Sequence, residues 1–127
     1  MSLPNFHDGY FDGFLVDANK GARLFLRAWN QQQYTLLMRS VVRLSISDVK
    51  EGNIIFDVVL REAHSITSSD IHDLYGVEEG SEPCARILES VRQARLQILE
   101  LNSSYGANGL FLFETFEVLE GTYQSAL

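Results

Sequence analysis

Three residues near the N-terminus, His7, Asp8 and Asp12, have types and spacing that suit metal or proton chemistry. An imidazole and two carboxylates can hold a divalent ion or share a proton. Residues four apart on an extended strand project to the same face, so Asp8 and Asp12 would converge. The competing interpretation is structural, because Asp8-Gly9 and Asp12-Gly13 are typical turn or bulge pairs. The turn chemistry of these pairs favours the structural interpretation.

A second group of candidate residues consists of arginines on the predicted strands. Eight of the ten basic residues are arginines. Several share one strand parity, which would put them on the sheet face opposite the apolar residues. Such a face would bind a carboxylate or phosphate ligand, or a protein partner. The alternative, a solvated face with Arg–Glu cross-strand pairs, is favoured because surface arginines need no special role. The candidate binding residues are Arg23, Arg27, Trp29, Arg39 and Arg43.

No motif in the sequence indicates a cofactor, since neither a P-loop nor a dinucleotide-binding glycine pattern is present. The single cysteine, Cys84, excludes an internal disulfide framework and is expected to be buried like a small apolar residue. We find no secretory signal and no apolar run near the roughly 18 residues that span a bilayer. These features predict a cytoplasmic protein without a membrane partner.

The composition predicts one globular domain over residues 1–127. Hydrophobic residues make up 46% of the chain and charged residues 21%, a balance typical of folded proteins. The net charge of −7 disfavours nucleic-acid binding, which depends on basic residues that neutralise phosphates. The same charge would speed association with a basic protein.

The N-terminal half reads as a meander of strands over Tyr10–Asp17, Ala22–Trp29, Tyr34–Leu44 and Asn53–Glu62. These segments are rich in the β-branched, aromatic and aliphatic residues that fit a pleated surface. A further apolar strand is predicted over Gly109–Leu119.

The turns set the expected register. Asn19-Lys20-Gly21 suits a three-residue hairpin loop, which would pair Ala18 with Ala22 and, further along, Val16 with Leu24 and Phe14 with Leu26. The next turn, around residues 31–33, would keep the apolar residues of both flanking strands on one face. Those residues are Leu24, Leu26, Ala28, Leu36 and Met38.

Two helices are expected in the second half. Thr67 to Asp70 predicts the cap of a short helix that reaches Tyr75 and stops at Gly76. A long helix is predicted to begin near Pro83 and to end at residues 102–104. Its apolar stripe comprises Ile87, Val91, Ala94, Ile98 and Leu101. The predicted fold is therefore α+β: an antiparallel sheet of about five strands, with one long C-terminal helix packed on a face before the last strand.

The segment Phe6-His7-Asp8-Gly9, the aromatic strand after it and the later Glu51-Gly52-Asn53-Ile54-Ile55 strand resemble parts of small uncharacterised bacterial proteins. The opening segment is also similar to that of some polymorphic-toxin immunity families. The resemblance covers mainly the N-terminal half. It implies a non-enzymatic, toxin-neutralising protein and assigns no binding residue.

Three functions are consistent with these observations. The first is a non-enzymatic cytoplasmic binding protein, immunity-like, with a basic protein partner such as a nuclease toxin. The second is a small metal-dependent enzyme or ligand-binding domain that uses His7, Asp8 and Asp12. The third is an oligomerising structural domain, because an exposed edge on the apolar last strand would pair with a second copy.

Overall fold

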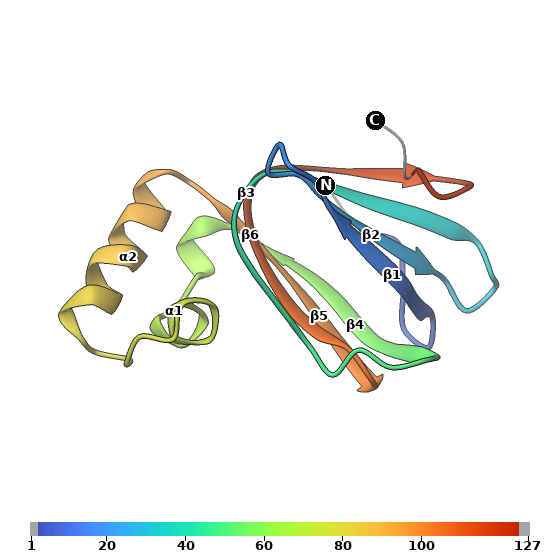
Figure 1. Cartoon of the computed structure of the whole chain (residues 1–127), viewed down its shortest axis with the longest axis horizontal. Helices are drawn as coiled ribbons and strands as arrows, with labels where there is room; N and C mark the ends of the chain where they lie inside the picture. The colour runs from blue at the N-terminus through green and yellow to red at the C-terminus, as the bar shows by residue number, and fades with distance from the viewer. Residues whose placement is uncertain (1–2, 125–127) are drawn as a thin grey trace.

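The structure is a computed structural model that describes residues 3–124. Six antiparallel strands form a closed barrel in the order β1-β2-β3-β6-β5-β4, and a small helical layer lies at one side of it (Figure 1). The elements are β1 (Tyr10–Val16), β2 (Ala22–Arg27), β3 (Gln33–Ser47), β4 (Asn53–Arg61), the 3₁₀ turn η1 (Ala63–Ser65), α1 (Ser68–Tyr75), α2 (Glu82–Gln93), β5 (Gln97–Tyr105) and β6 (Asn108–Glu120).

The long strands β3 and β6 hold the barrel together. They pair along nearly their whole length, with a register shift between Val41 and Arg43; just before the shift, Ser40 has a φ of 54°. Only the first half of β3 pairs with β2, up to Met38. A bulge of this kind bends the strand and increases its twist. The bend lets one strand pair join the β1-β2 part of the barrel to the β4-β5 part.

The barrel closes where β1 meets β4, through the pairs Tyr10–Ile54 and Phe11–Asn53. The buried Asn53 amide oxygen accepts hydrogen bonds from the backbone N–H groups of Lys50, at 2.8 Å, and Ala107, at 3.0 Å. Its amide nitrogen donates to the carbonyls of Lys50, at 2.6 Å, and Phe11, at 3.3 Å. One side chain therefore links three segments of the closure and satisfies buried backbone groups that would otherwise lack partners.

The barrel interior is filled by the inward-facing residues of all six strands. Alternation along each strand puts these residues on one face. The buried residues of this core are Phe6, Phe11, Ala22, Leu24, Leu26, Leu36, Met38, Ile55, Leu99, Leu101, Ala107, Phe111 and Phe113.

The first hairpin has a different register from the predicted one. Val16 pairs with Ala22 and Phe14 with Leu24, which is a shift of two residues. The loop is longer because Asp17 organises it: its carboxylate accepts hydrogen bonds from the backbone N–H groups of Asn19 and Gly21. A two-residue shift preserves the faces, so the inward pattern survives the error. For the second hairpin, the predicted shared face is confirmed, since Leu24 pairs with Leu36 and Ala22 with Met38.

The helical layer begins as its sequence predicts. Thr67 caps α1 in a capping box with Asp70, and Gly76 ends the helix with a φ of 71°. Ser81 caps α2. The two helices pack on the outer face of β5 and β6 through a second apolar core, which includes the buried Cys84. The buried members are Ile66, Ile71, Leu74, Cys84, Val91, Leu96, Ile98 and Leu112.

The predicted long helix is wrong. α2 ends at Gln93, Arg95 adopts a φ of 55°, and the chain continues as β5. On β5, Ile98 faces the helical core while Leu99 faces the barrel core. A strand buried on both faces is apolar at successive positions, and such a run also satisfies helical spacing.

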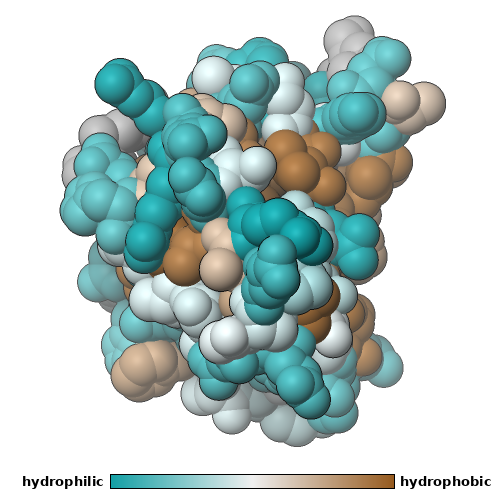
Figure 2. Space-filling view, turned by 90° about the vertical axis from the view of Figure 1, so that its left-hand side faces the viewer, coloured by the Kyte–Doolittle hydropathy of each residue, from teal (hydrophilic) through white to brown (hydrophobic). Residues whose placement is uncertain are grey.

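The predicted fold class is wrong for the same reason. An open sheet of about five strands with one long helix becomes a closed barrel of six strands with two short helices. β4 does not continue the N-terminal meander; it pairs with β5 on one side and with β1 on the other. Among residues 3–124, no helix is long and apolar enough to cross a membrane. Figure 2 shows the side of the molecule that carries the helices, where hydrophilic residues predominate around small hydrophobic areas.

Candidate functional site

The segment Phe6-His7-Asp8-Gly9 forms a tight turn that docks onto the barrel. The backbone N–H of Gly9 donates to the carbonyl of Phe6 at 2.8 Å, and the Phe6 side chain is buried in the core. A Cβ at Gly9 would lie 2.2 Å from the carbonyl oxygen of Arg27, so only glycine fits here. The geometry supports the structural interpretation of this turn.

The structure places His7 and Asp8 together but gives Asp12 other partners. His7 Nε2 lies 3.5 Å from the Asp8 carboxylate, while His7 Nδ1 bonds the Phe56 carbonyl at 2.8 Å. Asp12 pairs with Arg27 and Tyr123 instead. Within residues 3–124, no group of three or more His, Cys, Asp or Glu side chains could hold a metal ion.

Asp12 belongs to a network on the outer face of β1 and β2. Arg27 donates two hydrogen bonds to its carboxylate, at 2.5 and 3.0 Å, and the Tyr123 hydroxyl donates a third. Burial would raise the pKa of Asp12, but the hydrogen bonds from Arg27 and Tyr123 outweigh that effect and lower it. The Arg27 guanidinium also lies over the Tyr10 ring, at 4.5 Å from its centroid. The network fastens the segment after β6 to the barrel.

The four arginines of the predicted cationic face are engaged in separate local contacts. Arg43 stays on the outer face after the bulge in β3, since it pairs with Leu112 of the helical core, and each arginine has its own local partner. Trp29, with 69% of its surface exposed, Arg39 and Arg43 are exposed, whereas Arg23 is buried. The pairs are Arg23 with Asp17 at 3.6 Å, Arg27 with Asp12, Arg39 with Glu117 at 3.2 Å, and Arg43 with the Leu74 carbonyl at 3.1 Å.

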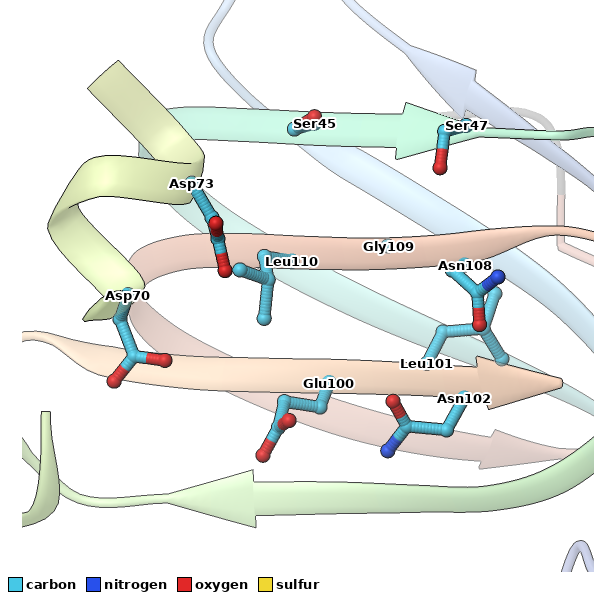
Figure 3. Close-up of a pocket in the computed structure, with 10 residues that line it drawn as sticks. All are labelled: Ser45, Ser47, Asp70, Asp73, Glu100, Leu101, Asn102, Asn108, Gly109 and Leu110. Atoms are coloured by element: carbon cyan, nitrogen blue, oxygen red, sulfur yellow. The ribbon is translucent and has the colours of Figure 1, made fainter. Parts of the chain in front are cut away.

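A polar cavity of about 400 Å³ lies between α1 and the outer face of β3, β6 and β5 (Figure 3). We call it the acidic pocket. Side chains from α1 form one end, and residues of the three strands form the floor. The lining residues are Ser45, Ser47, Asp70, Asp73, Glu100, Leu101, Asn102, Asn108, Gly109 and Leu110.

One arginine partly neutralises the acidic pocket. Arg61 on β4 donates to both carboxylate oxygens of Asp70, at 2.9 and 2.7 Å, and its Nε lies 2.7 Å from Glu100. Burial would raise the pKa of Asp70, but the hydrogen bonds from Arg61 and Thr67 outweigh it and lower the pKa. Asp70 therefore stays ionised at neutral pH.

Negative charge is left over in the acidic pocket. Asp73 is exposed on α1 and forms no hydrogen bond or ion pair with the other residues that the structure describes. Three carboxylates thus line the acidic pocket, and Arg61 pairs with two of them, Asp70 and Glu100. Serine hydroxyls and the amides of Asn102 and Asn108 supply further oxygen acceptors. This arrangement suits an ammonium or guanidinium group, which donates hydrogen bonds and carries positive charge.

The acidic pocket is absent from the sequence-based predictions. Its residues come from α1, β3, β5 and β6, and they meet only after the barrel has closed. One signal was present: the alternation of Glu100 and Asn102 with Leu99 and Leu101 marks a polar strand face. The prediction of a helix over those residues concealed it.

Comparison with known proteins adds no identification. No family model, curated protein or solved structure matches this chain.

Proposed function

We propose that this chain is a non-enzymatic, immunity-like binding protein whose acidic pocket receives a lysine or arginine side chain of a basic protein partner. The supporting observation is the excess of carboxylates over guanidinium groups around a cavity of about 400 Å³. The net charge of −7 would attract such a partner over a longer range.

The acidic pocket has the size and chemistry of a receptor for one long side chain. Its floor is held by strands, so its geometry is set before the partner arrives. Asp73 offers a carboxylate that Arg61 does not occupy, while Arg61 keeps Asp70 and Glu100 in place. A preorganised site of this kind loses little entropy when a partner binds.

The test is calorimetric titration of an octalysine peptide into the wild-type chain and the variant Asp73→Asn. We expect the variant to bind about tenfold more weakly, since removing one charge-assisted contact costs about 1.4 kcal/mol. Glu89→Gln is the matched control, because Glu89 is an exposed acid on α2 that does not line the pocket. Equal losses in both variants would show that only net charge matters and would contradict the proposal.

A further inference from the structure

Two strand edges of the barrel lack partners over part of their length. β1 pairs with β4 only at Tyr10 and Phe11, so residues 12–16 have no strand on that side among those described. β3 pairs with β2 only up to Met38, so among the described strands residues 42–47 have β6 as their one pairing partner. Free edges of this kind offer backbone N–H and C=O groups to an added strand.

The two free edges border one opening. The β1–β2 loop contacts the β3 bulge through a hydrogen bond from Val41 N–H to the Lys20 carbonyl, at 2.7 Å. At the other end, residues 48–52 connect β3 to the start of β4, beside Phe11. Figure 1 shows the second half of β3 running from this hairpin to that loop. We call the region framed by residues 12–21 and 41–52 the pairing gap.

Apolar side chains that belong to the inner face reach solvent at the pairing gap. Phe14 and Val16 pair with the inward-facing Leu24 and Ala22, yet they are 42% and 49% exposed. Leu44 packs against the core but is only partly buried. Exposed apolar residues on a free strand edge, with no charged residue between 13 and 16, are the usual mark of an interaction surface.

The free edge of β3 also borders the acidic pocket. Leu44 and Ile46 lie on the barrel side of β3, whereas Ser45 and Ser47 line the acidic pocket on the helix side. A strand added to this edge would continue the same alternation. Its residues would alternately cover the apolar pairing gap and face the acidic pocket.

We propose that the partner binds by strand addition at the pairing gap, through an extended segment in which basic and apolar residues alternate. This inference rests on the proposed function and specifies the partner's chemistry. The apolar residues cover Phe14, Val16 and Leu44, and the basic residues face Asp73. A second copy of the chain is a poorer occupant, because it would bring another acidic surface to an acidic one.

The first test uses the peptide (Lys-Val)₄ and a block peptide, Lys₄Val₄, of the same composition. We expect the alternating peptide to bind at least about tenfold more tightly, because only it matches both faces at once. Two further versions carry N-methyl groups on either the lysine or the valine amides, which removes the donors of one peptide edge. At least one of these should lose about tenfold in affinity, whereas equal affinity for all four peptides would overturn strand addition.

The second test changes the protein. Val16→Lys puts a like charge on the free edge of β1 and should weaken (Lys-Val)₄ binding about tenfold. Trp29→Lys, at an exposed site in the β2–β3 turn, is the control and should have little effect. A wild-type dimer in light scattering that Val16→Lys dissociates would overturn the proposal, since a second copy would then cover the edge.

The two proposals fail in different ways. If octalysine and all four peptides bind with similar affinity, and Asp73→Asn weakens each of them, the acidic pocket is a cation site and strand addition is wrong. If (Lys-Val)₄ binding depends on amide N–H groups but not on Asp73, the edge is used and the acidic pocket is not. That result would overturn both the proposed function and the basic character of the partner.

Discussion

The guanidinium of Arg61 on β4 donates hydrogen bonds to both carboxylate oxygens of Asp70 on α1, at 2.9 and 2.7 Å. Asp70 also accepts a hydrogen bond from the backbone N–H of Thr67, at 2.8 Å, which completes the cap of α1. One buried carboxylate therefore fastens the helix to the barrel and forms one end of the acidic pocket.

The Arg61–Asp70 pair makes stability depend on pH. The pKa of Asp70 is lower in the folded chain than in the unfolded chain, so the unfolded chain takes up the proton first as the pH falls. This contribution is complete above a pH of about 4 and is lost as the pH falls towards the lowered pKa. We expect Asp70→Asn to cost about 2–3 kcal/mol at pH 7 and less in acid.

Chemical denaturation of both proteins between pH 7 and pH 3 measures this difference. The two free energies of unfolding should converge as the pH falls. A constant difference would show that Asp70 acts through packing rather than charge. Glu62→Gln, at an exposed site near the end of β4, is the control.

Asn53 is predicted to be the most sensitive polar residue of the barrel closure. Asn53→Ala leaves the N–H groups of Lys50 and Ala107 without their partner and opens a cavity beside Gly106. We expect a loss of about 3 kcal/mol in the free energy of unfolding, measured in urea. Asn19→Ala, in the exposed first loop, should cost less than about 1 kcal/mol. Similar losses in the two variants would contradict the role of Asn53.

Gly9 and His7 should respond very differently to replacement by alanine. In Gly9→Ala the added methyl group would clash with the Arg27 carbonyl oxygen. We expect this variant to lower the free energy of unfolding by about 3 kcal/mol or more. His7→Ala removes one exposed hydrogen bond and should cost less than about 1 kcal/mol. Thermal unfolding of the two variants compares them directly, and a larger loss for His7→Ala would contradict this assignment.

The metal hypothesis for His7, Asp8 and Asp12 makes a separate prediction. Asp12 already bonds Arg27 and Tyr123. We therefore expect no divalent ion to produce a rise in melting temperature that the wild type shows and His7→Ala loses. The measurement is a thermal-shift screen with divalent metals on both proteins. An upward shift that disappears in His7→Ala would favour the metal-dependent alternative.

Binding to the acidic pocket should weaken as salt rises. Contacts between exposed charges are screened over about 8–10 Å at physiological ionic strength. We therefore expect the dissociation constant for octalysine to increase steadily between 50 and 500 mM NaCl, with a smaller slope for Asp73→Asn. A slope that is the same in both proteins would show that Asp73 does not contribute.

Local sequence determined the short-range structure of this protein. The cap at Thr67, the stop at Gly76 and the shared face of Leu24 and Leu36 follow from residues close together in the chain. Capping, turn chemistry and alternation act over a few residues, so they can be read without the fold.

Tertiary structure decided the rest. Whether residues 97–101 form a helix or a strand depends on burial from two sides at once, and only the closed barrel with its helical layer supplies both. The same closure brings Asp70, Glu100 and Ser45 around one pocket. Contacts between residues far apart in the chain carry this information, because local propensity is too weak to outweigh burial.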